Sequence, residues 1–296
     1  MINHRFLRKS SDLTDTKQEV SMTLEDYFSI RDYIYEKSGM YFADSKRDFV
    51  EVRVKKRVSD NNFQNFKDYY YFLKYNTSDR EFKMLMDAVT INETKFFRDI
   101  PLLTAFETKV LENVIQNKAN SPFKQIKILS AGCSTGEEPY TLTMILDDNK
   151  LRLKNIDFQI TAGDISEEAL TTAKNGIYKD TQLRSTEKKY MDRYFVKDLN
   201  NNYKISPMLK NKINFRYLNL SDFRGMKMLG KFDIIFCRNV MIYFDNKFKI
   251  ELVKTFYDML NNNSYFFIGH SESLFGINND FKMEKVNGIV VYKKEE

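Results

Sequence analysis

The sequence predicts an α/β fold: a mostly parallel sheet covered by helices, preceded by an all-α N-terminal domain and interrupted by a small antiparallel β-subdomain. Three observations predict it. Residues 21–91 carry helical patterns, with one ambiguous segment. Strand and helix patterns then alternate through residues 121–296, which is typical of a parallel sheet. Short strand-like pieces between Asn-rich turns interrupt this alternation at about residues 186–219. Residues 1–20 are polar and predicted to be a flexible tail, and residues 92–120 to be a linker.

The composition sets broad limits. A chain of 296 residues with 42% apolar content can bury a full core and is long enough for two domains. The net charge of +6 favours an acidic partner, or it describes a well-solvated surface, because 47 basic residues stand beside 41 acidic ones. The first residues lack an apolar signal segment, and no run reaches the roughly 18 residues of a membrane span. We therefore expect a cytoplasmic protein without membrane insertion.

Two cysteines cannot build a disulfide framework, and we expect Cys133 and Cys237 to be reduced thiols. Together with the scattered His4 and His270 they offer no metal-ligand spacing. We expect no bound metal.

Two capping boxes are predicted in the N-terminal domain. Thr23 with Asp26 opens the first helix, which Gly39 ends. Ser78 with Glu81 is expected to open a later helix in the same way.

The segment around Val50 is ambiguous. Val50, Val52 and Val54 alternate like a strand, whereas Val50, Val54 and Val58 fit a helix. The helical surroundings favour a helix.

Such a helix would carry a basic strip. Arg53, Lys56 and Arg57 share one face at positions i, i+3 and i+4, and Lys55 lies nearby. The strip is either a solvated surface or a docking site for an acidic partner.

The elements of the α/β domain follow from the alternation. Pro101 suits the first turn of a connecting helix that ends near Asn117. The expected strands are 126–130, 158–163, 232–237, 264–269 and 288–292, and the expected helices are 137–147, 166–175 and 246–260. The pieces assigned to the β-subdomain are 194–196, 203–205 and 213–215.

The first strand runs into a small-residue turn, Ala131 to Gly136, and a helix follows at once. Glycine lets the backbone pass close to a ligand, and a helix that begins there presents free N–H groups. This arrangement holds nucleotide-like cofactors in α/β folds. Asp164, at the end of the second strand, could accept hydrogen bonds from both ribose hydroxyls, or cap the next helix, or do both.

Five segments together resemble a known family. NETKFFR, SAGCSTGEEPY, AGDIS, CRNVMIYFD and GHSES occur in the order found in the chemotaxis-receptor glutamate methyltransferases, the CheR family, and the resemblance spans Ser21 to Tyr292. It implies that residues 121–296 form an S-adenosylmethionine-dependent, Rossmann-like methyltransferase domain. The implied activity is that of a protein-glutamate O-methyltransferase. It would form methyl esters on the cytoplasmic helical bundle of chemotaxis receptors for sensory adaptation, with S-adenosylhomocysteine as product.

The resemblance also implies a set of cofactor contacts at matching positions. They are Asn92, Thr94, Arg98, Gly132, Glu138, Asp164, Asn219, Leu220, Arg238 and Asn239. In this pattern Asp164 holds the ribose, and Asn219 and Leu220 flank the adenine. Arg238 and Asn239 lie beside the methionine part.

Arg98 and Tyr243 are the implied candidates for the transfer step. A glutamate is ionised at neutral pH, so its methylation needs no general base. Arg98 could hold one carboxylate oxygen by a charge-assisted bond and leave the other to attack. Tyr243 would donate a hydrogen bond near the sulfonium or the entering carboxylate.

The implied partners are methyl-accepting chemotaxis receptors, and the strip of Arg53, Lys55, Lys56 and Arg57 becomes their candidate docking site. We expect a monomer that binds no nucleic acid. Whether the β-subdomain binds a receptor C-terminal peptide stays open.

Three other classes of protein are disfavoured. A nucleic-acid methyltransferase is disfavoured because Cys237-Arg238-Asn239-Val240 replaces the Pro-containing motif of amino-group methylation, and no proline precedes Cys237. A non-catalytic S-adenosylmethionine-binding scaffold is disfavoured because Arg98 and Tyr243 are present. A dehydrogenase is disfavoured by the missing G-x-G-x-x-G.

Overall fold

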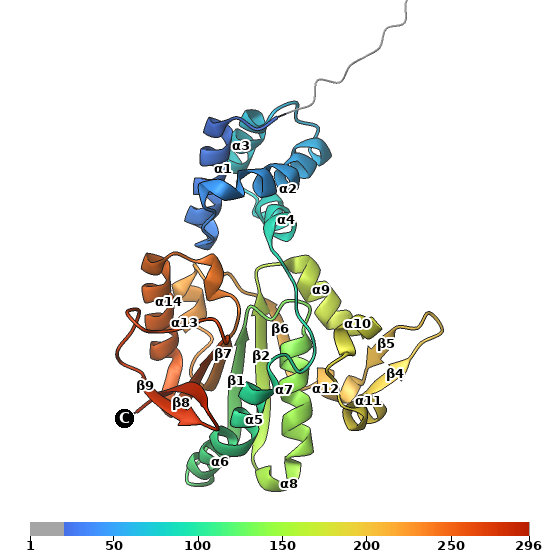
Figure 1. Ribbon diagram of the computed structural model, residues 1–296, viewed down its shortest axis with the longest axis vertical. Coiled ribbons are helices and arrows are strands. Elements are labelled where there is room, and N and C mark those ends of the chain that lie inside the picture. Colours follow the sequence, from blue (N-terminus) through green and yellow to red (C-terminus); the bar gives the residue numbers. More distant parts are fainter. Residues whose placement is uncertain (1–20, 296) are drawn as a thin grey trace, which may run out of the picture.

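The computed structural model describes residues 21–295. The predicted tail, residues 1–20, and with it His4, lies outside the described residues. An N-terminal helical domain sits above the carboxyl ends of the sheet strands of an α/β domain, and an extended segment after α4 connects the two (Figure 1).

The helical domain contains α1 (Leu24–Ser38), α2 (Arg47–Asp60), α3 (Phe66–Tyr75) and α4 (Arg80–Val89). The first predicted capping box is confirmed, because the side chains of Thr23 and Asp26 each accept from the other's backbone N–H. The ambiguous valine segment lies in α2. Its burial shows why: Val50, Val54 and Val58 are buried, whereas Val52 is 70% exposed.

The second predicted capping box is wrong. Helix α4 begins at Arg80, and its N-cap makes no side-chain bond. Glu81 turns into the core instead, where its carboxylate accepts hydrogen bonds from Arg57 and from the Tyr69 hydroxyl. These charge-assisted bonds outweigh a cap at a solvent-exposed helix end.

A seven-stranded sheet forms the centre of the α/β domain, in the order β6-β2-β1-β7-β8-β10-β9. The first five strands in this order are parallel, and β10 and β9 are antiparallel. Their bounds are β1 (Gln125–Ala131), β2 (Asp157–Asp164), β6 (Ile213–Tyr217), β7 (Phe232–Cys237), β8 (Leu260–Ile268), β9 (Lys282–Val286) and β10 (Ile289–Lys294). The five predicted strands correspond to β1, β2, β7, β8 and β10, whereas β9 was not predicted.

Helices cover both faces of this sheet (Figure 1). They are α7 (Glu137–Asp148), α8 (Lys150–Leu153), α9 (Glu167–Asn175), α13 (Phe223–Lys227) and α14 (Asn246–Met259). The predicted connecting helix is continuous from α5 (Ile100–Ala105) through a π-helical stretch (Phe106–Val110) to α6 (Leu111–Ala119).

The small antiparallel sheet has the order β3-β5-β4, with β3 (Ile177–Tyr178), β4 (Phe195–Lys197) and β5 (Tyr203–Ile205). It lies beside α10 (Asp180–Leu183), α11 (Lys188–Tyr194) and α12 (Pro207–Lys210), at one side of the domain (Figure 1). The assignment of 213–215 to this subdomain is wrong. That segment is β6, which pairs in parallel with β2 as an edge strand of the main sheet. A short alternating run looks the same in either sheet, and its partner is distant in sequence.

Two hydrophobic cores hold these layers together. One runs without a break from the helical domain to one face of the sheet and to α14, and includes Tyr27, Ile235 and Phe256. The other lies on the opposite face and includes Phe106 and Phe236. The helical domain therefore shares a packed core with the sheet. Within residues 21–295, no helix combines the length and the apolar character that a membrane span requires.

Candidate active site

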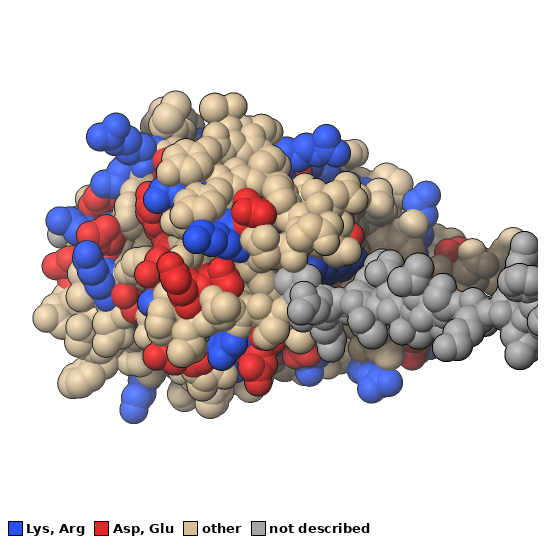
Figure 2. All heavy atoms as spheres, turned by 90° about the horizontal axis from the view of Figure 1, so that it is seen from above, with Lys and Arg blue, Asp and Glu red and all other residues tan. Residues whose placement is uncertain are grey.

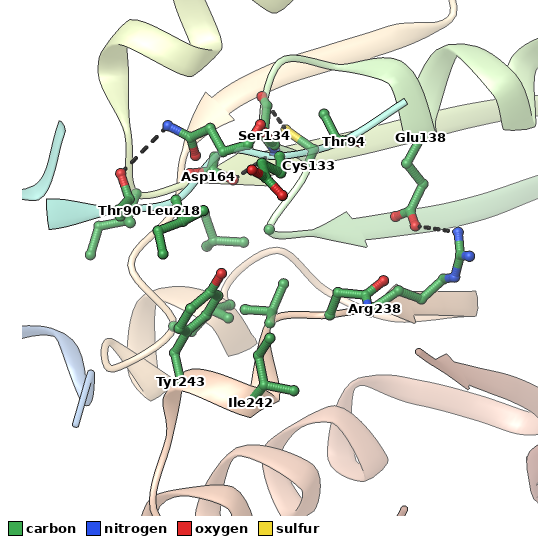
Figure 3. Close-up of a pocket in the computed structure, with 18 of the residues that line it drawn as sticks. Thr90, Thr94, Cys133, Ser134, Glu138, Asp164, Leu218, Arg238, Ile242 and Tyr243 are labelled. Atoms are coloured by element: carbon green, nitrogen blue, oxygen red, sulfur yellow. Dashed lines mark hydrogen bonds and ion pairs between the residues drawn. The ribbon is translucent and has the colours of Figure 1, made fainter. Parts of the chain in front are cut away.

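A cavity of about 260 Å³ lies at the carboxyl ends of the parallel strands, below the helical domain. All the residues predicted to contact the cofactor or to act in methyl transfer line it: Asn92, Thr94, Arg98, Gly132, Glu138, Asp164, Asn219, Leu220, Arg238, Asn239 and Tyr243. They come from the linker after α4, the turn after β1, the first turn of α7, the segments after β2, β6 and β7, and a 3-10 helix (Met241–Tyr243). Figure 3 shows several of them facing the cavity. The structure thus brings the predicted set together, and the role of each member stays a prediction.

The turn after β1 passes close to its neighbours. Gly132 has φ 77°, and a Cβ added there would collide with the side chain of Val240. The backbone N–H groups of Gly132 and Cys133 both donate to the carbonyl of Gly163, at 2.8 and 3.0 Å. Glycine is required at position 132 both by the positive φ and by this close approach.

Asp164 is buried against this turn. Its Oδ2 accepts from the Ser134 N–H at 2.7 Å, and its Oδ1 accepts from the Ser166 N–H at 2.9 Å. Burial raises the pKa of Asp164, and the backbone N–H bonds partly offset this rise. Ser166 is the N-cap of α9, so Asp164 does not cap that helix. A carboxylate has about four acceptor positions, which leaves Asp164 capacity for a hydroxyl donor from the cavity.

Glu138 and Arg238 form an ion pair on another wall of the cavity (Figure 3). Arg238 Nη1 donates to Glu138 Oε2 at 3.0 Å, and Ser130 Oγ donates to Glu138 Oε1 at 2.7 Å. Arg238 Nη2 donates to the carbonyl of Arg98 at 2.7 Å. This arginine therefore fixes the linker against the end of β7.

Arg98, in the linker before α5, and Tyr243, in the 3-10 helix Met241–Tyr243, both line the cavity. Arg98 is half-buried, and its Nη1 donates to the carbonyl of Glu93 at 3.1 Å. The Tyr243 hydroxyl points into the cavity (Figure 3). Burial raises the pKa of Tyr243 and the positive charge of Arg98 lowers it, with a net rise, so the hydroxyl is a donor at neutral pH.

One polar residue behind the cavity had no predicted role. Glu272 Oε2 accepts from the backbone N–H groups of Asn239 at 2.9 Å and Gly269 at 2.6 Å. A Cβ on Gly269 would lie 2.9 Å from the Asn239 backbone nitrogen, so glycine permits this approach. The carboxylate thereby holds Asn239, which has φ 58°. The sequence feature that could have identified Glu272 is its position three residues after Gly269, a glycine at the end of a predicted strand.

Of the four residues of the predicted basic strip, three are accessible at the surface, and their docking role stays a prediction. Arg57 is buried and makes bonds to both oxygens of Glu81, so it cannot dock a partner, and that prediction is wrong. Arg53 and Lys56 are exposed and Lys55 is half-exposed. Figure 2, which looks onto the helical-domain end, shows basic and acidic side chains interspersed rather than gathered in one strip.

Both cysteines are free and buried. Burial raises the pKa of each thiol well above its usual value. Cys237 is a packing residue of β7 with a protonated thiol and does not fit the nucleophile of a carbon-5 methyltransferase. The part of the chain that the structure describes contains no group of three His, Cys, Asp or Glu residues able to hold a metal.

Comparison with known proteins identifies close relatives. Residues 25–90 match the family model "CheR methyltransferase, all-alpha domain", and residues 92–290 match "CheR methyltransferase, SAM binding domain". Chemotaxis protein methyltransferase 2 of Vibrio cholerae is 33% identical over 93% of this chain and 95% of its own. The chemotaxis protein methyltransferases of Borreliella burgdorferi and Escherichia coli are 33% and 31% identical over 88% and 90% of this chain, and over 92% and 90% of their own lengths.

The cavity fits S-adenosylmethionine. The cofactor has a ribose diol, an adenine ring and a zwitterionic methionine part. The cavity offers the buried carboxylate of Asp164, the apolar side chain of Leu220 and the charged pair of Glu138 and Arg238. The chain therefore belongs to the CheR methyltransferase family and binds S-adenosylmethionine.

Proposed function

We propose that this protein is a protein-glutamate O-methyltransferase that esterifies glutamate side chains on the cytoplasmic helical bundle of chemotaxis receptors and so serves sensory adaptation. The observation that carries the proposal is the placement of Arg98 and Tyr243 on the cavity that also contains Asp164. A cation and a neutral hydroxyl donor suit an anionic acceptor. The names of the relatives, chemotaxis protein methyltransferases, support the same direction.

The cofactor would be held at both of its ends. Asp164 would accept hydrogen bonds from the ribose, while Asn219 and Leu220 would flank the adenine. The carboxylate of Glu138 suits the ammonium of the methionine part, and Arg238 suits its carboxylate. Asn92 and Thr94, from the linker, would close the cavity over the bound cofactor.

S-adenosylmethionine supplies a methyl group bonded to a sulfonium. The acceptor carboxylate is already ionised, so a C–O bond would form as the S–C bond breaks, and no proton would need to move. Arg98 would hold one carboxylate oxygen and leave the other free to attack. Too tight a grip would stabilise the ground state, so we assign Arg98 a positioning effect rather than activation. Tyr243 would donate a hydrogen bond beside the entering carboxylate.

The reaction cancels two opposite charges, which water stabilises when they are separated. A cavity that excludes water and aligns the two groups would therefore lower the barrier. The linker and the helical domain cover the strand ends, with Ser38 and Met40 contributing to the cavity wall. This cover is consistent with such exclusion.

Docking would use the exposed part of the basic strip. Arg53, Lys55 and Lys56 lie on α2, whose buried valines face the core, and their side chains are exposed or half-exposed. A cationic surface steers association with a glutamate-bearing bundle, and salt screens this effect. Methylation should slow with added salt, and the dependence should weaken in the charge-reversal variant Arg53→Glu/Lys56→Glu.

The test is methyl transfer from labelled S-adenosylmethionine to the cytoplasmic fragment of a receptor from the same cell. Mild base should release the label as methanol, which marks a carboxyl ester. Arg98→Ala should lower turnover about 100-fold while S-adenosylhomocysteine still binds. A base-stable product, or no transfer by a protein that binds the cofactor, would refute a glutamate acceptor.

A further inference from the structure

A short relay of hydrogen bonds joins the helical domain to the cavity acid. Asp87, on α4, accepts at Oδ1 from the Ser166 hydroxyl at 2.7 Å and from the Glu168 N–H at 3.2 Å. The Ser166 N–H in turn donates to Asp164 Oδ1 at 2.9 Å. Asp87 does not line the cavity, yet one residue separates it from the carboxylate that does.

Ser166 depends on this contact. It is completely buried, and its hydroxyl oxygen already accepts from the Ala169 N–H as the N-cap of α9. Its hydroxyl proton needs an acceptor, because an unpaired buried donor is costly. Asp87 supplies that acceptor from another domain. Its negative charge also lies at the N-terminus of α9, where the helix dipole favours an anion.

The other oxygen of Asp164 has a similar support. Ser134 donates its N–H to Asp164 Oδ2 at 2.7 Å, and its hydroxyl donates to the carbonyl of Asn92 at 3.1 Å. Asn92 belongs to the linker that leaves α4. Ser134 and Ser166 thus each donate a backbone N–H to the Asp164 carboxylate. The hydroxyl of each serine in turn donates to α4 or to the linker that follows it.

We propose that Asp87 is a positioning residue for the cofactor site, which orients the Asp164 carboxylate through Ser166. The packing of the helical domain against the α/β domain then determines the orientation of the Asp164 carboxylate. This inference rests on the proposed role of Asp164 as the ribose acceptor.

A neighbouring contact across the same interface provides a control. Lys83, also on α4, pairs with Glu167 at the start of α9 at 2.6 Å, and its ammonium lies over the ring of Tyr217. The pair is partly exposed, and such pairs contribute little. Lys83→Ala loosens the α4–α9 contact without cutting the bonds from Asp87 to Asp164.

The experiment measures the dissociation constant of S-adenosylhomocysteine by calorimetry on the full-length protein. Asp87→Ala should raise it about two- to tenfold, the effect of one lost hydrogen bond. Asp87→Asn keeps an acceptor oxygen and should bind nearly as well as the parent, as should Lys83→Ala. With the receptor fragment as acceptor, Asp87→Ala should raise the KM for S-adenosylmethionine more than it lowers kcat.

A double-mutant cycle tests whether the effect travels through Ser166. In a Ser166→Ala background, Asp87→Ala should have almost no further effect on S-adenosylhomocysteine binding. Additive effects, or equal losses in Asp87→Ala and Lys83→Ala, would overturn the relay. If Asp87→Ala does not fold, Ser166→Ala cuts the same link from the other domain, and Ser166→Thr, which retains the hydroxyl, is its control.

Asp164→Ala separates this inference from the proposed function. Unchanged S-adenosylhomocysteine binding in Asp164→Ala would refute the ribose role and the relay with it. Weakened binding in Asp164→Ala, with unchanged binding in Asp87→Ala, would refute the relay alone.

Discussion

Within residues 21–295, the Arg57–Glu81 pair and the Arg238–Glu138 pair differ in how completely their polar atoms are paired. In the helical domain, Arg57 Nε and Nη2 each donate to one oxygen of Glu81, at 2.9 and 2.8 Å, and the Tyr69 hydroxyl adds a third bond at 2.8 Å. At the cavity, Arg238 and Glu138 share a single bond of 3.0 Å.

The remaining atoms of the cavity pair are used differently. Arg238 Nη2 donates to a backbone carbonyl and lies 3.7 Å from Asp99 Oδ2, whereas its buried Nε has no partner within the described part of the chain. Glu138 accepts at Oε1 from Ser130 Oγ and lines the cavity. Buried charges are tolerated where partners surround them. The complete pair is therefore part of the fold, whereas the incomplete pair suits a site where a zwitterionic ligand supplies further partners.

The largest effect should come from breaking the complete pair. Arg57→Ala leaves Glu81 charged, buried and without its bidentate donor, and should lower the free energy of unfolding by about 3–5 kcal/mol. Urea unfolding measures this. Lys56→Ala, at an exposed position of the same helix, should change the free energy of unfolding by about 0.5 kcal/mol or less. A similar loss of unfolding free energy in both variants would show that the Arg57–Glu81 pair stabilises the fold no more than an exposed side chain does.

These pairs also show where sequence reasoning reaches its limit. The helical period correctly put Arg53 and Arg57 on α2, but the burial of Arg57 depends on Glu81, a long-range partner that no local pattern reveals. The same limit misplaced β6, whose pairing with β2 is equally distant.

The cavity was easier to predict, for a topological reason. Alternating strands and helices imply a parallel sheet, and the carboxyl ends of parallel strands meet at one edge. Polar residues at those ends, such as Asp164 and Asn239, must therefore lie near one another. Glu272 was missed because it follows an inner strand by a turn, and its contact with the Asn239 backbone is visible only in the folded chain.

The second prediction breaks the incomplete pair. Glu138→Ala should weaken S-adenosylhomocysteine binding about 30-fold or more, because Arg238 loses the nearer of its two carboxylates and the ligand loses an anionic partner. Its loss of stability should be smaller than that of Arg57→Ala, since Arg238 keeps the Arg98 carbonyl. Calorimetry and urea unfolding on the same preparations compare the two. Unaltered binding with a large stability loss would make this pair structural as well.

The third prediction concerns Glu272, whose carboxylate has one oxygen with hydrogen-bond partners, as in the complete pair, and one without, as in the incomplete pair. Its Oε2 accepts two backbone N–H groups, whereas its buried Oε1 has no partner among the described residues. Glu272→Ala should weaken S-adenosylhomocysteine binding about tenfold by releasing Asn239. Glu272→Gln keeps one acceptor oxygen and should retain most of the affinity. Equal losses in the two variants would mean that the charge of Glu272, rather than its acceptor oxygen, holds Asn239.

The smallest effect should be the response of the cavity to acid. Burial raises the pKa of Asp164, so its carboxylate takes up a proton as the pH falls through that raised value. A protonated carboxyl offers fewer acceptor positions to a ribose, and S-adenosylhomocysteine binding should weaken by at most about tenfold per pH unit, the limit for one proton.

The free energy of unfolding should respond to pH in the opposite direction. A carboxyl whose pKa is higher in the folded than in the unfolded state opposes folding when ionised, and protonation relieves this cost. The parent should therefore gain stability relative to Asp164→Asn as the pH falls through this range, while its affinity declines. Asp164→Asn should bind weakly at every pH in the range. Calorimetric titrations and urea unfolding of both proteins at several pH values measure these trends, and affinity and stability declining together would place the titration at another group.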